Sequence, residues 1–287
     1  MFYGVGKKTK ISLGEVYHYI RIIHTGGTIA SIYNLQGLIE IIPKLNRLSA
    51  YSLATHSFFD NKNTFGTFLG ITVVCGFYLF SIDRKKIYLV SSLFQLAMCI
   101  FSFCRSALLF LLVYFILQYK NFKKIAFIIL LASIICLILH SSTNISQFII
   151  EKVLRLEYTD TGRRVIWHNV WISSNFHGFD YLIGIGPSEM EWSSVSYVHN
   201  IYLESLVTGG FAKIFYYAFL LSYSLYNITK IQDMNLRVFC SGVMGGYLVY
   251  GMVESVLLFE LGLIPFLFAF ITFFIPCLQS NQKDLWD

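Results

Sequence analysis

Long charge-free stretches of hydrophobic residues alternate with short basic clusters along most of the chain. Seven stretches contain no Asp, Glu, Lys or Arg: Thr64–Ile82, Ile87–Cys104, Ser106–Tyr119, Ile125–Ile150, Ile214–Thr229, Val238–Val253 and Leu261–Gln282. A helix needs about 20 apolar residues to cross the hydrocarbon layer of a bilayer, and an open strand there would leave its backbone polar groups unpaired. The pattern therefore predicts an all-α, polytopic membrane bundle of about seven spans.

The basic residues indicate the direction in which these spans run. If the first span ends in the cytoplasm, the inner connections hold nine Lys or Arg: three in 83–86, three in 120–124, two in 230–237 and one in the tail. The positive-inside rule favours this orientation. It places a large loop, which we expect to carry short helices, and the turn at Glu254 on the outer face.

The same pattern divides the chain into five regions. We expect an N-terminal outer segment of interfacial helices and loops at 1–63 and spans one to four at 64–140. The large outer loop follows at 141–204, spans five to seven at 205–282 and a cytoplasmic tail at 283–287. Within the first region, Gly26-Gly27 is expected to end any helix that starts at Val16. The seven Lys and Arg of that region conflict with an outer location, although long segments follow the charge rule only weakly.

The composition supports a membrane protein and removes other classes. Hydrophobic residues make up 56% of the 287 residues and charged residues 13%, about half the charged fraction of ordinary soluble domains. The formal net charge is +6, but the basic residues lie at the ends of apolar stretches, so no nucleic-acid partner is expected. The six cysteines form no Cys-x-x-Cys pair and no Cys/His spacing, so neither a metal nor another cofactor is expected.

Candidate chemistry lies on the predicted outer side. Arg105 stands at the end of a span, where it is either an interfacial anchor or a ligand for phosphate, which arginine binds with two hydrogen bonds. In the large loop, the pair Arg163 and Arg164 precedes Trp167, and His199 opens the next helix. An arginine pair is usually solvated and a lone histidine is usually structural, so the argument depends on the order of these motifs.

In this order, Arg163-x-x-x-Trp167, Gly184-Ile185-Gly186-Pro187 and His199-Asn200 resemble the signature of the bacterial O-antigen polymerases and O-antigen ligases, a family of integral membrane glycosyltransferases. Upstream, Asn61-Lys62-Asn63-Thr64-Phe65-Gly66 and the stretch Ser102–Leu109 resemble the starts of two of their spans. The resemblance covers about residues 60–275. Family members usually have ten or more spans, so the chain is expected to correspond to the carboxyl-terminal two-thirds of a typical member.

The resemblance implies an enzyme of the bacterial inner membrane that takes a glycan from undecaprenyl pyrophosphate on the outer leaflet and transfers it to an acceptor glycan. It implies that His199 is the catalytic base or orients the acceptor hydroxyl, and that Arg105 with Arg163, or its alternative Arg164, binds the pyrophosphate. Trp167 and Asn200 are expected to bind the substrate, Trp167 by stacking on a sugar unless it belongs to an aromatic belt at the membrane interface. No Asp-x-Asp cluster is present to bind a metal, so the inverting transfer is expected to be metal-independent.

Two further questions stay open at this level. Polymerase is favoured over ligase because the outer loop is modest in length, while a non-catalytic polysaccharide transporter or flippase would show paired half-repeats that the chain lacks. Glu204 follows His199 by five residues, which displaces it by about 140° on a helix, so it is not expected to orient the imidazole. The expected partners are the lipid-linked glycan, the acceptor glycan, the bilayer and a chain-length regulator.

Overall fold

A computed structural model describes residues 11–41, 57–59, 61–118, 167–168, 177–186, 198–256 and 262–280 of the chain. Its helices are α2 (Leu13–Tyr33), α3 (Leu35–Ile41), α4 (Lys62–Asp83), α5 (Lys86–Phe101), α6 (Arg105–Gln118), α10 (Asp180–Ile183), α12 (Ile201–Lys230), α13 (Met234–Tyr250), α14 (Leu263–Ala269), the π-helical segment η5 (Phe270–Phe274) and α15 (Ile275–Ser280). No strand occurs in these ranges, and the predicted all-α fold is confirmed for them.

Three helical segments are long and apolar enough to cross a membrane. They are α4, α12 and the continuous run from α14 to α15, Leu263–Ser280. The apolar helices α5 and α6 are shorter, and α13 coincides with a further predicted stretch. The stretch Ile125–Ile150 lies outside the described residues, so the total of seven spans stays a prediction.

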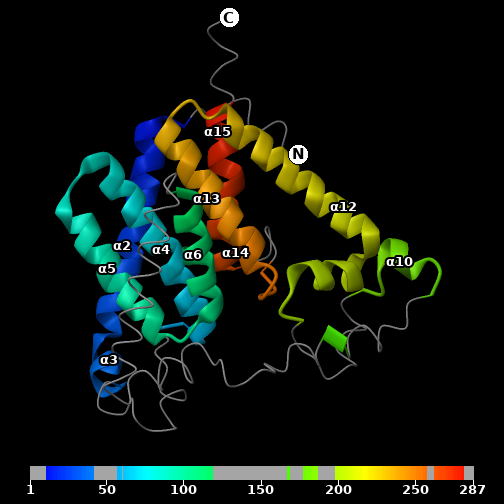
Figure 1. Cartoon of the computed structure of the whole chain (residues 1–287), viewed down its shortest axis with the longest axis horizontal. Coiled ribbons are helices and arrows are strands. Elements are labelled where there is room, and N and C mark those ends of the chain that lie inside the picture. The colour runs from blue at the N-terminus through cyan, green and yellow to red at the C-terminus, as the bar shows by residue number, and fades with distance from the viewer. Residues whose placement is uncertain are drawn as a thin grey trace, which may run out of the picture.

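The helices of the bundle run in opposite directions, and their termini gather at two ends (Figure 1). We call one the Arg105 end, where α6 begins and α13 finishes, and the other the Asp83 end, where α4 finishes and α13 begins. The most enclosed helix is α4, because it packs against α2, α5, α6 and α13. Its buried side chains include Phe65, Leu69 and Val73, which form part of one continuous hydrophobic core.

The course of α2 contradicts the expectation that Gly26-Gly27 ends a helix. The helix begins with a capping box, in which Ser12 and Glu15 each bond the backbone of the other, and continues through both glycines to Tyr33. A Cβ at position 27 would overlap the side chain of Thr72 on α4. Gly27 therefore permits a close helix–helix contact, which outweighs a helical penalty of about 1 kcal/mol.

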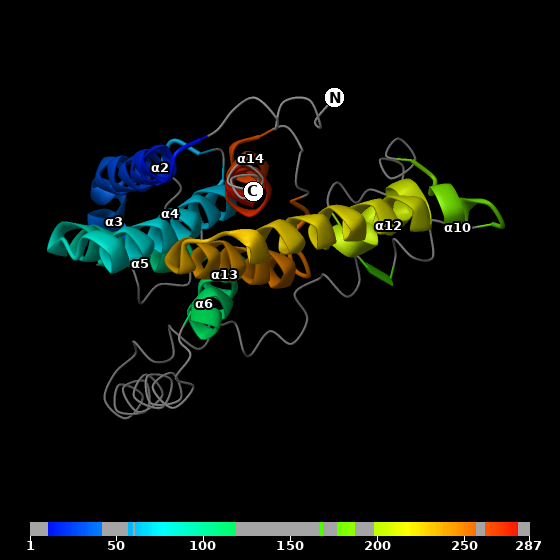
Figure 2. The same cartoon turned by 90° about the horizontal axis from the view of Figure 1, so that it is seen from above.

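The long helix α12 is broken at Gly210, which has a φ of 60° and a ψ of −161°. The backbone of Gly184, in the Gly-Ile-Gly turn, lies directly against the backbone of Gly209, with no room for a Cβ between them. The Ile185 N–H donates a 2.9 Å hydrogen bond to the carbonyl of Val207, which the break would otherwise leave without a helical partner. The turn thus supports the break, and Figure 2 shows α12 extending from the bundle toward α10.

Candidate functional site

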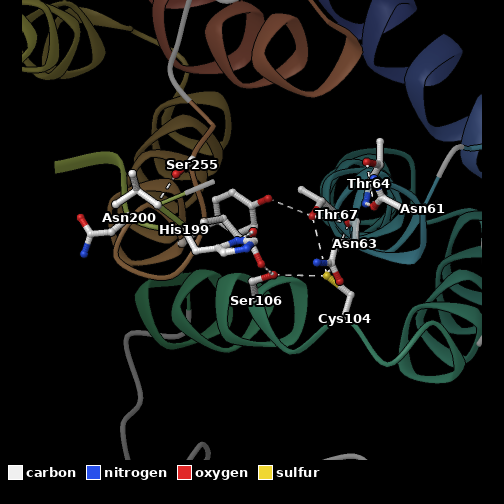
Figure 3. Close-up of polar contacts among 12 residues, drawn as sticks. Asn61, Asn63, Thr64, Thr67, Cys104, Ser106, His199, Asn200 and Ser255 are labelled. Carbon is white, nitrogen blue, oxygen red and sulfur yellow. Dashed lines mark hydrogen bonds and ion pairs between the residues drawn. The ribbon is translucent and has the colours of Figure 1, made fainter. Parts of the chain in front are cut away.

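A buried carboxylate, that of Glu254, joins a polar cluster at the Arg105 end, of which Figure 3 labels Ser106, His199 and Asn200. Glu254 is in the turn that follows α13 and is 7% exposed. Its Oε1 accepts a 3.0 Å hydrogen bond from the Ser106 hydroxyl, and its Oε2 lies 3.3 Å from Nδ1 of His199. The cluster therefore joins the start of α6, the end of α13 and the segment that leads into α12.

The contact with Glu254 orients the His199 imidazole. An ionised carboxylate can only accept a hydrogen bond, so Nδ1 carries the hydrogen and Nε2 is the ring nitrogen that can take up a proton. The His199 side chain is 32% exposed, whereas that of Glu254 is 10% exposed. The histidine is therefore more accessible than the carboxylate behind it.

Asn200 fixes the backbone next to His199. Its Oδ1 accepts hydrogen bonds of 3.0 and 2.9 Å from two N–H groups of the first turn of α12, as an N-cap does. Its Nδ2 donates to the Met252 carbonyl at 3.2 Å, and its N–H donates to the Ser255 hydroxyl at 3.1 Å. Asn200 therefore attaches the start of α12 to the turn that carries Glu254, while its expected contact with substrate stays a prediction.

The backbone of His199 itself is in the left-handed region, with a φ of 53°. Outside glycine, this conformation is uncommon but is enriched in asparagine, aspartate and histidine, and it is kept only where the surroundings restrain the backbone. The contacts of the neighbouring Asn200 supply that restraint.

The polar cluster continues from Ser106 into α4. Cys104 Sγ lies 3.3 Å from the Ser106 hydroxyl and 3.9 Å from Oγ1 of Thr67. Thr67 donates its single hydroxyl hydrogen to the Asn63 carbonyl at 2.8 Å, so in its 3.1 Å contact with Tyr250 the tyrosine hydroxyl donates. Because Tyr250 lies one helical turn before the central carboxylate, the cluster connects α4, α6 and α13 at one level.

Arg105 is the first residue of α6 and directly precedes Ser106. Its side chain is partly buried. The structure therefore brings two of the predicted site residues, Arg105 and His199, to the same end of the bundle and links their segments through Ser106 and Glu254. Arg163 and Arg164 lie outside the described residues, and their predicted role at the pyrophosphate stays a prediction.

Trp167 supports the segment that carries the histidine. Its indole N–H donates a 2.8 Å hydrogen bond to the carbonyl of Val198, the residue directly before His199. It packs in a small apolar cluster with Val198, Val207, Ile185 and Leu203. This contact gives Trp167 a positioning role, and its predicted stacking on a sugar is a separate expectation.

No protein-family model matches this chain, and no curated protein is detectably similar to it. The resemblance to O-antigen polymerases and ligases therefore depends on the order and spacing of the motifs. The geometry adds an independent observation, because His199 and Ser106, the residue that follows Arg105, both contact the Glu254 carboxylate although they are far apart in the sequence.

Glu254 is the site residue that sequence reasoning missed. It was recognised only as part of a short outer turn, whereas the structure makes it the orienting partner of His199 from a position 55 residues later. The available signal was an acidic residue directly after the apolar stretch Val238–Val253, since ionisable groups at such places often have a function. The sequence alone did not show that this stretch returns beside His199.

The arrangement offers a base and a cation at the same end of the bundle. His199 can remove a proton from a hydroxyl, and the carboxylate behind it stabilises the imidazolium that forms. The guanidinium of Arg105 can pair with a phosphate. Within the described ranges, no three His, Cys, Asp or Glu side chains gather as a metal ion would require.

Proposed function

We propose that the chain is a polymerase of lipid-linked oligosaccharide repeat units in bacterial surface polysaccharide biosynthesis, for O-antigen or capsule. The observation that carries this proposal is the His199–Glu254 pair, connected through Ser106 to the helix that Arg105 begins. The cluster lies at one end of a bundle whose helices include three of membrane-spanning length and polarity. Such a place suits a substrate with a lipid tail in the bilayer and a glycan in water.

In the proposed reaction, Nε2 of His199 accepts the proton of the acceptor hydroxyl as its oxygen attacks the anomeric carbon of the donor sugar. The bond from that carbon to the pyrophosphate oxygen breaks, and the lipid pyrophosphate leaves with the electron pair. Arg105, with Arg163 by resemblance, stabilises the negative charge on the leaving group. Attack opposite the leaving group inverts the configuration at the anomeric carbon.

The site is proposed to face the periplasm from the bacterial inner membrane. The positive-inside rule supports this orientation, because the basic clusters near Arg84 and Arg237 belong to the Asp83 end. The catalytic cluster lies at the opposite end, where a lipid-linked glycan of the outer leaflet would be found. A ligase would use the same donor and the same cluster, and would differ only in its acceptor.

The glycan made by cells that lack the gene tests the proposal. A product with a single repeat unit attached to its final acceptor is expected for a polymerase. Long chains that remain on the lipid carrier would indicate a ligase instead, and repeat units trapped in the cytoplasm would indicate a flippase. Either of these two results would overturn the polymerase assignment.

A variant series then tests the site. Restoring the gene with Arg105→Ala should reduce transfer about tenfold or more, because a charged hydrogen bond contributes about 1.5–3 kcal/mol. Arg105→Lys should recover little, since an ammonium group does not reproduce the planar guanidinium. Lys86→Ala, at an exposed basic residue of the Asp83 end, is the matched control and should leave transfer unchanged at equal membrane levels. Normal chain lengths with Arg105→Ala would contradict the proposed site.

A further inference from the structure

The polarity of α2 is the reverse of that expected for a helix that borders water. Between Ile22 and Tyr33 its buried face carries polar or small residues, including His24, Gly27 and Ser31. Its outward face carries Ile22, Ile29 and Ile32, which are 55%, 60% and 59% exposed. Helices surrounded by lipid show this arrangement, because polar and small side chains then pack between helices.

The buried polar face of α2 is bonded to its neighbours. Nδ1 of His24 donates to the Thr72 carbonyl on α4 at 3.0 Å, and its Nε2 lies 2.7 Å from the Ser91 hydroxyl on α5. The amide nitrogen of Gln95 donates to the Thr28 hydroxyl at 2.8 Å and to the His24 carbonyl at 3.1 Å. These contacts hold α2, α4 and α5 together through groups that would be costly to expose to lipid.

Contacts along α2 join it to both ends of α4. At the Asp83 end, Arg21, the ninth residue of α2, forms a 2.9 Å ion pair with Asp83, and the residues of α2 before it reach to the Ile11 carbonyl, which accepts a 2.9 Å hydrogen bond from the Gln279 amide. At the Arg105 end, the Ala30 carbonyl accepts a 3.1 Å hydrogen bond from Ser57, which lies shortly before α4. With 21 residues, α2 is about 31 Å long in total, and the part from Ile22 to Tyr33, beyond the Arg21–Asp83 pair, accounts for about 18 Å of that length.

The outward face of α2 is also continuous with a candidate span on its other side. Tyr19 lies edge-on to Phe270, with ring centroids 5.8 Å apart, and Phe270 belongs to the run Leu263–Ser280. Helix α2 is therefore flanked by two segments of membrane-spanning character, α4 and Leu263–Ser280. The environment that covers their outer faces covers the face of α2 as well.

We propose that α2 is an additional membrane-spanning helix, in contact with lipid through Ile22, Ile29 and Ile32, which begins on the Asp83 side. Length and composition alone do not identify it, because Arg21, His24 and the glycines lower its apolar character although they face other helices or the Asp83 end. The proposal replaces the expectation that 1–63 lies wholly on the outer face. It also brings the lysines that precede the helix to the side that the positive-inside rule favours.

Labelling from the two sides of the membrane tests this topology. In a parent whose six cysteines are replaced, and which keeps its normal membrane level, Gly14→Cys and Gln36→Cys place one thiol near each end of α2. We expect an impermeant maleimide to label Gln36→Cys in intact spheroplasts and Gly14→Cys only after permeabilisation, together with the reference Lys86→Cys. Labelling of positions 14 and 36 from the same side would overturn the proposal.

A measurement at the middle of the helix separates lipid from water. A nitroxide attached at Ile29→Cys should collide often with oxygen and rarely with a water-soluble nickel chelate, whereas one at Gln36→Cys should show the opposite preference. Ile29→Arg should lower the amount of membrane-inserted protein several-fold, and Gln36→Arg should not. Ready access of the nickel chelate to position 29 would overturn the lipid contact, whatever glycan the protein makes.

Discussion

Two histidines, His24 and His199, each contact other polar groups of the protein, but their environments differ in exposure and in charge. His24 is 3% exposed, and its two nitrogens contact a backbone carbonyl and a serine hydroxyl, both neutral. The His199 side chain is 32% exposed, and its Nδ1 faces the carboxylate of Glu254. The first environment is closed and uncharged, while the second is open on one side and charged on the other.

The difference separates a structural histidine from a candidate catalytic one. A proton transferred to His24 would leave a positive charge enclosed among neutral groups, which is unfavourable. A proton transferred to His199 would form an imidazolium beside a carboxylate, which stabilises it. Variants of the two clusters should therefore affect different properties, namely transfer at one cluster and folding at the other.

The largest effect is expected for His199→Ala. Loss of a general base typically reduces a rate by about 100- to 10,000-fold. The effect is measured as release of lipid pyrophosphate by the purified protein, with the variant and wild-type proteins at equal concentration. Removal of the imidazole also takes its contact away from the buried Glu254 carboxylate, so the melting temperature is measured alongside and turnover is expressed per folded molecule. Wild-type turnover by this variant would remove His199 from the mechanism.

A smaller loss is expected for Glu254→Gln. The amide keeps the volume and the contact with Ser106 but supplies no charge to stabilise the imidazolium, so transfer should fall about 10- to 100-fold. Glu204→Gln, on the first turns of α12, is the matched control and should be close to wild type. Equal activity of the two variants, in the same release assay, would show that the Glu254 carboxylate does not support His199.

For the other histidine, His24→Ala should act on stability. The substitution removes the imidazole bonds to the Thr72 carbonyl and the Ser91 hydroxyl and leaves a cavity between α2, α4 and α5, which costs about 1–3 kcal/mol, and turnover per folded molecule should be unchanged. His18→Ala, on the exposed side of the same helix, should change stability by less than about 0.5 kcal/mol. Thermal unfolding in detergent measures both. A catalytic defect with normal stability in His24→Ala would reverse the distinction between the two histidines.

The smallest contrast is expected between two adjacent glycines. Gly27→Ala must displace Thr72 and should destabilise the protein by about 1–3 kcal/mol, whereas a Cβ at Gly26 meets only Phe68, at an ordinary 3.6 Å. Gly26→Ala should therefore be neutral or stabilising by up to about 1 kcal/mol, because alanine favours the helix. The same unfolding measurement compares them, and equal effects would show that α2 and α4 are not packed this closely.

The apolar stretches were sufficient to locate α4, α5, α6 and α13, because these helices are hydrophobic over most of their length. They were not sufficient for α2, since Gly26-Gly27 reads as a helix end unless the close approach of Thr72 is known. Hydropathy lowers the predicted membrane character of a helix for every polar residue in it, whereas the His24 side chain is buried among hydrogen-bond partners from other helices. The sequence pattern therefore predicts the uniformly apolar helices and fails for α2, which packs through polar groups.

The candidate site shows the same limit. Arg105 and His199 were recognisable because each stands in a short motif at the end of an apolar stretch. Glu254 has no motif, and its role arises only because α13 returns to the level at which α12 begins. Asn200 and Trp167 were interpreted as substrate contacts, and the structure shows that both also bond the backbone around His199. A motif indicates that a residue matters without showing what it touches.

The break at Gly210 has a consequence for how α12 tolerates changes in length. In an unbroken helix, one inserted residue rotates everything beyond it by about 100° and shifts it by 1.5 Å. Asn200 fastens the first turn of α12 to the loop after α13, whereas beyond the glycine Tyr217 bonds Tyr247 and Asn227 bonds Ser280. One residue inserted directly after Gly210 is therefore expected to misplace Tyr217 and Asn227 and to leave the alignment of His199 with Glu254 intact.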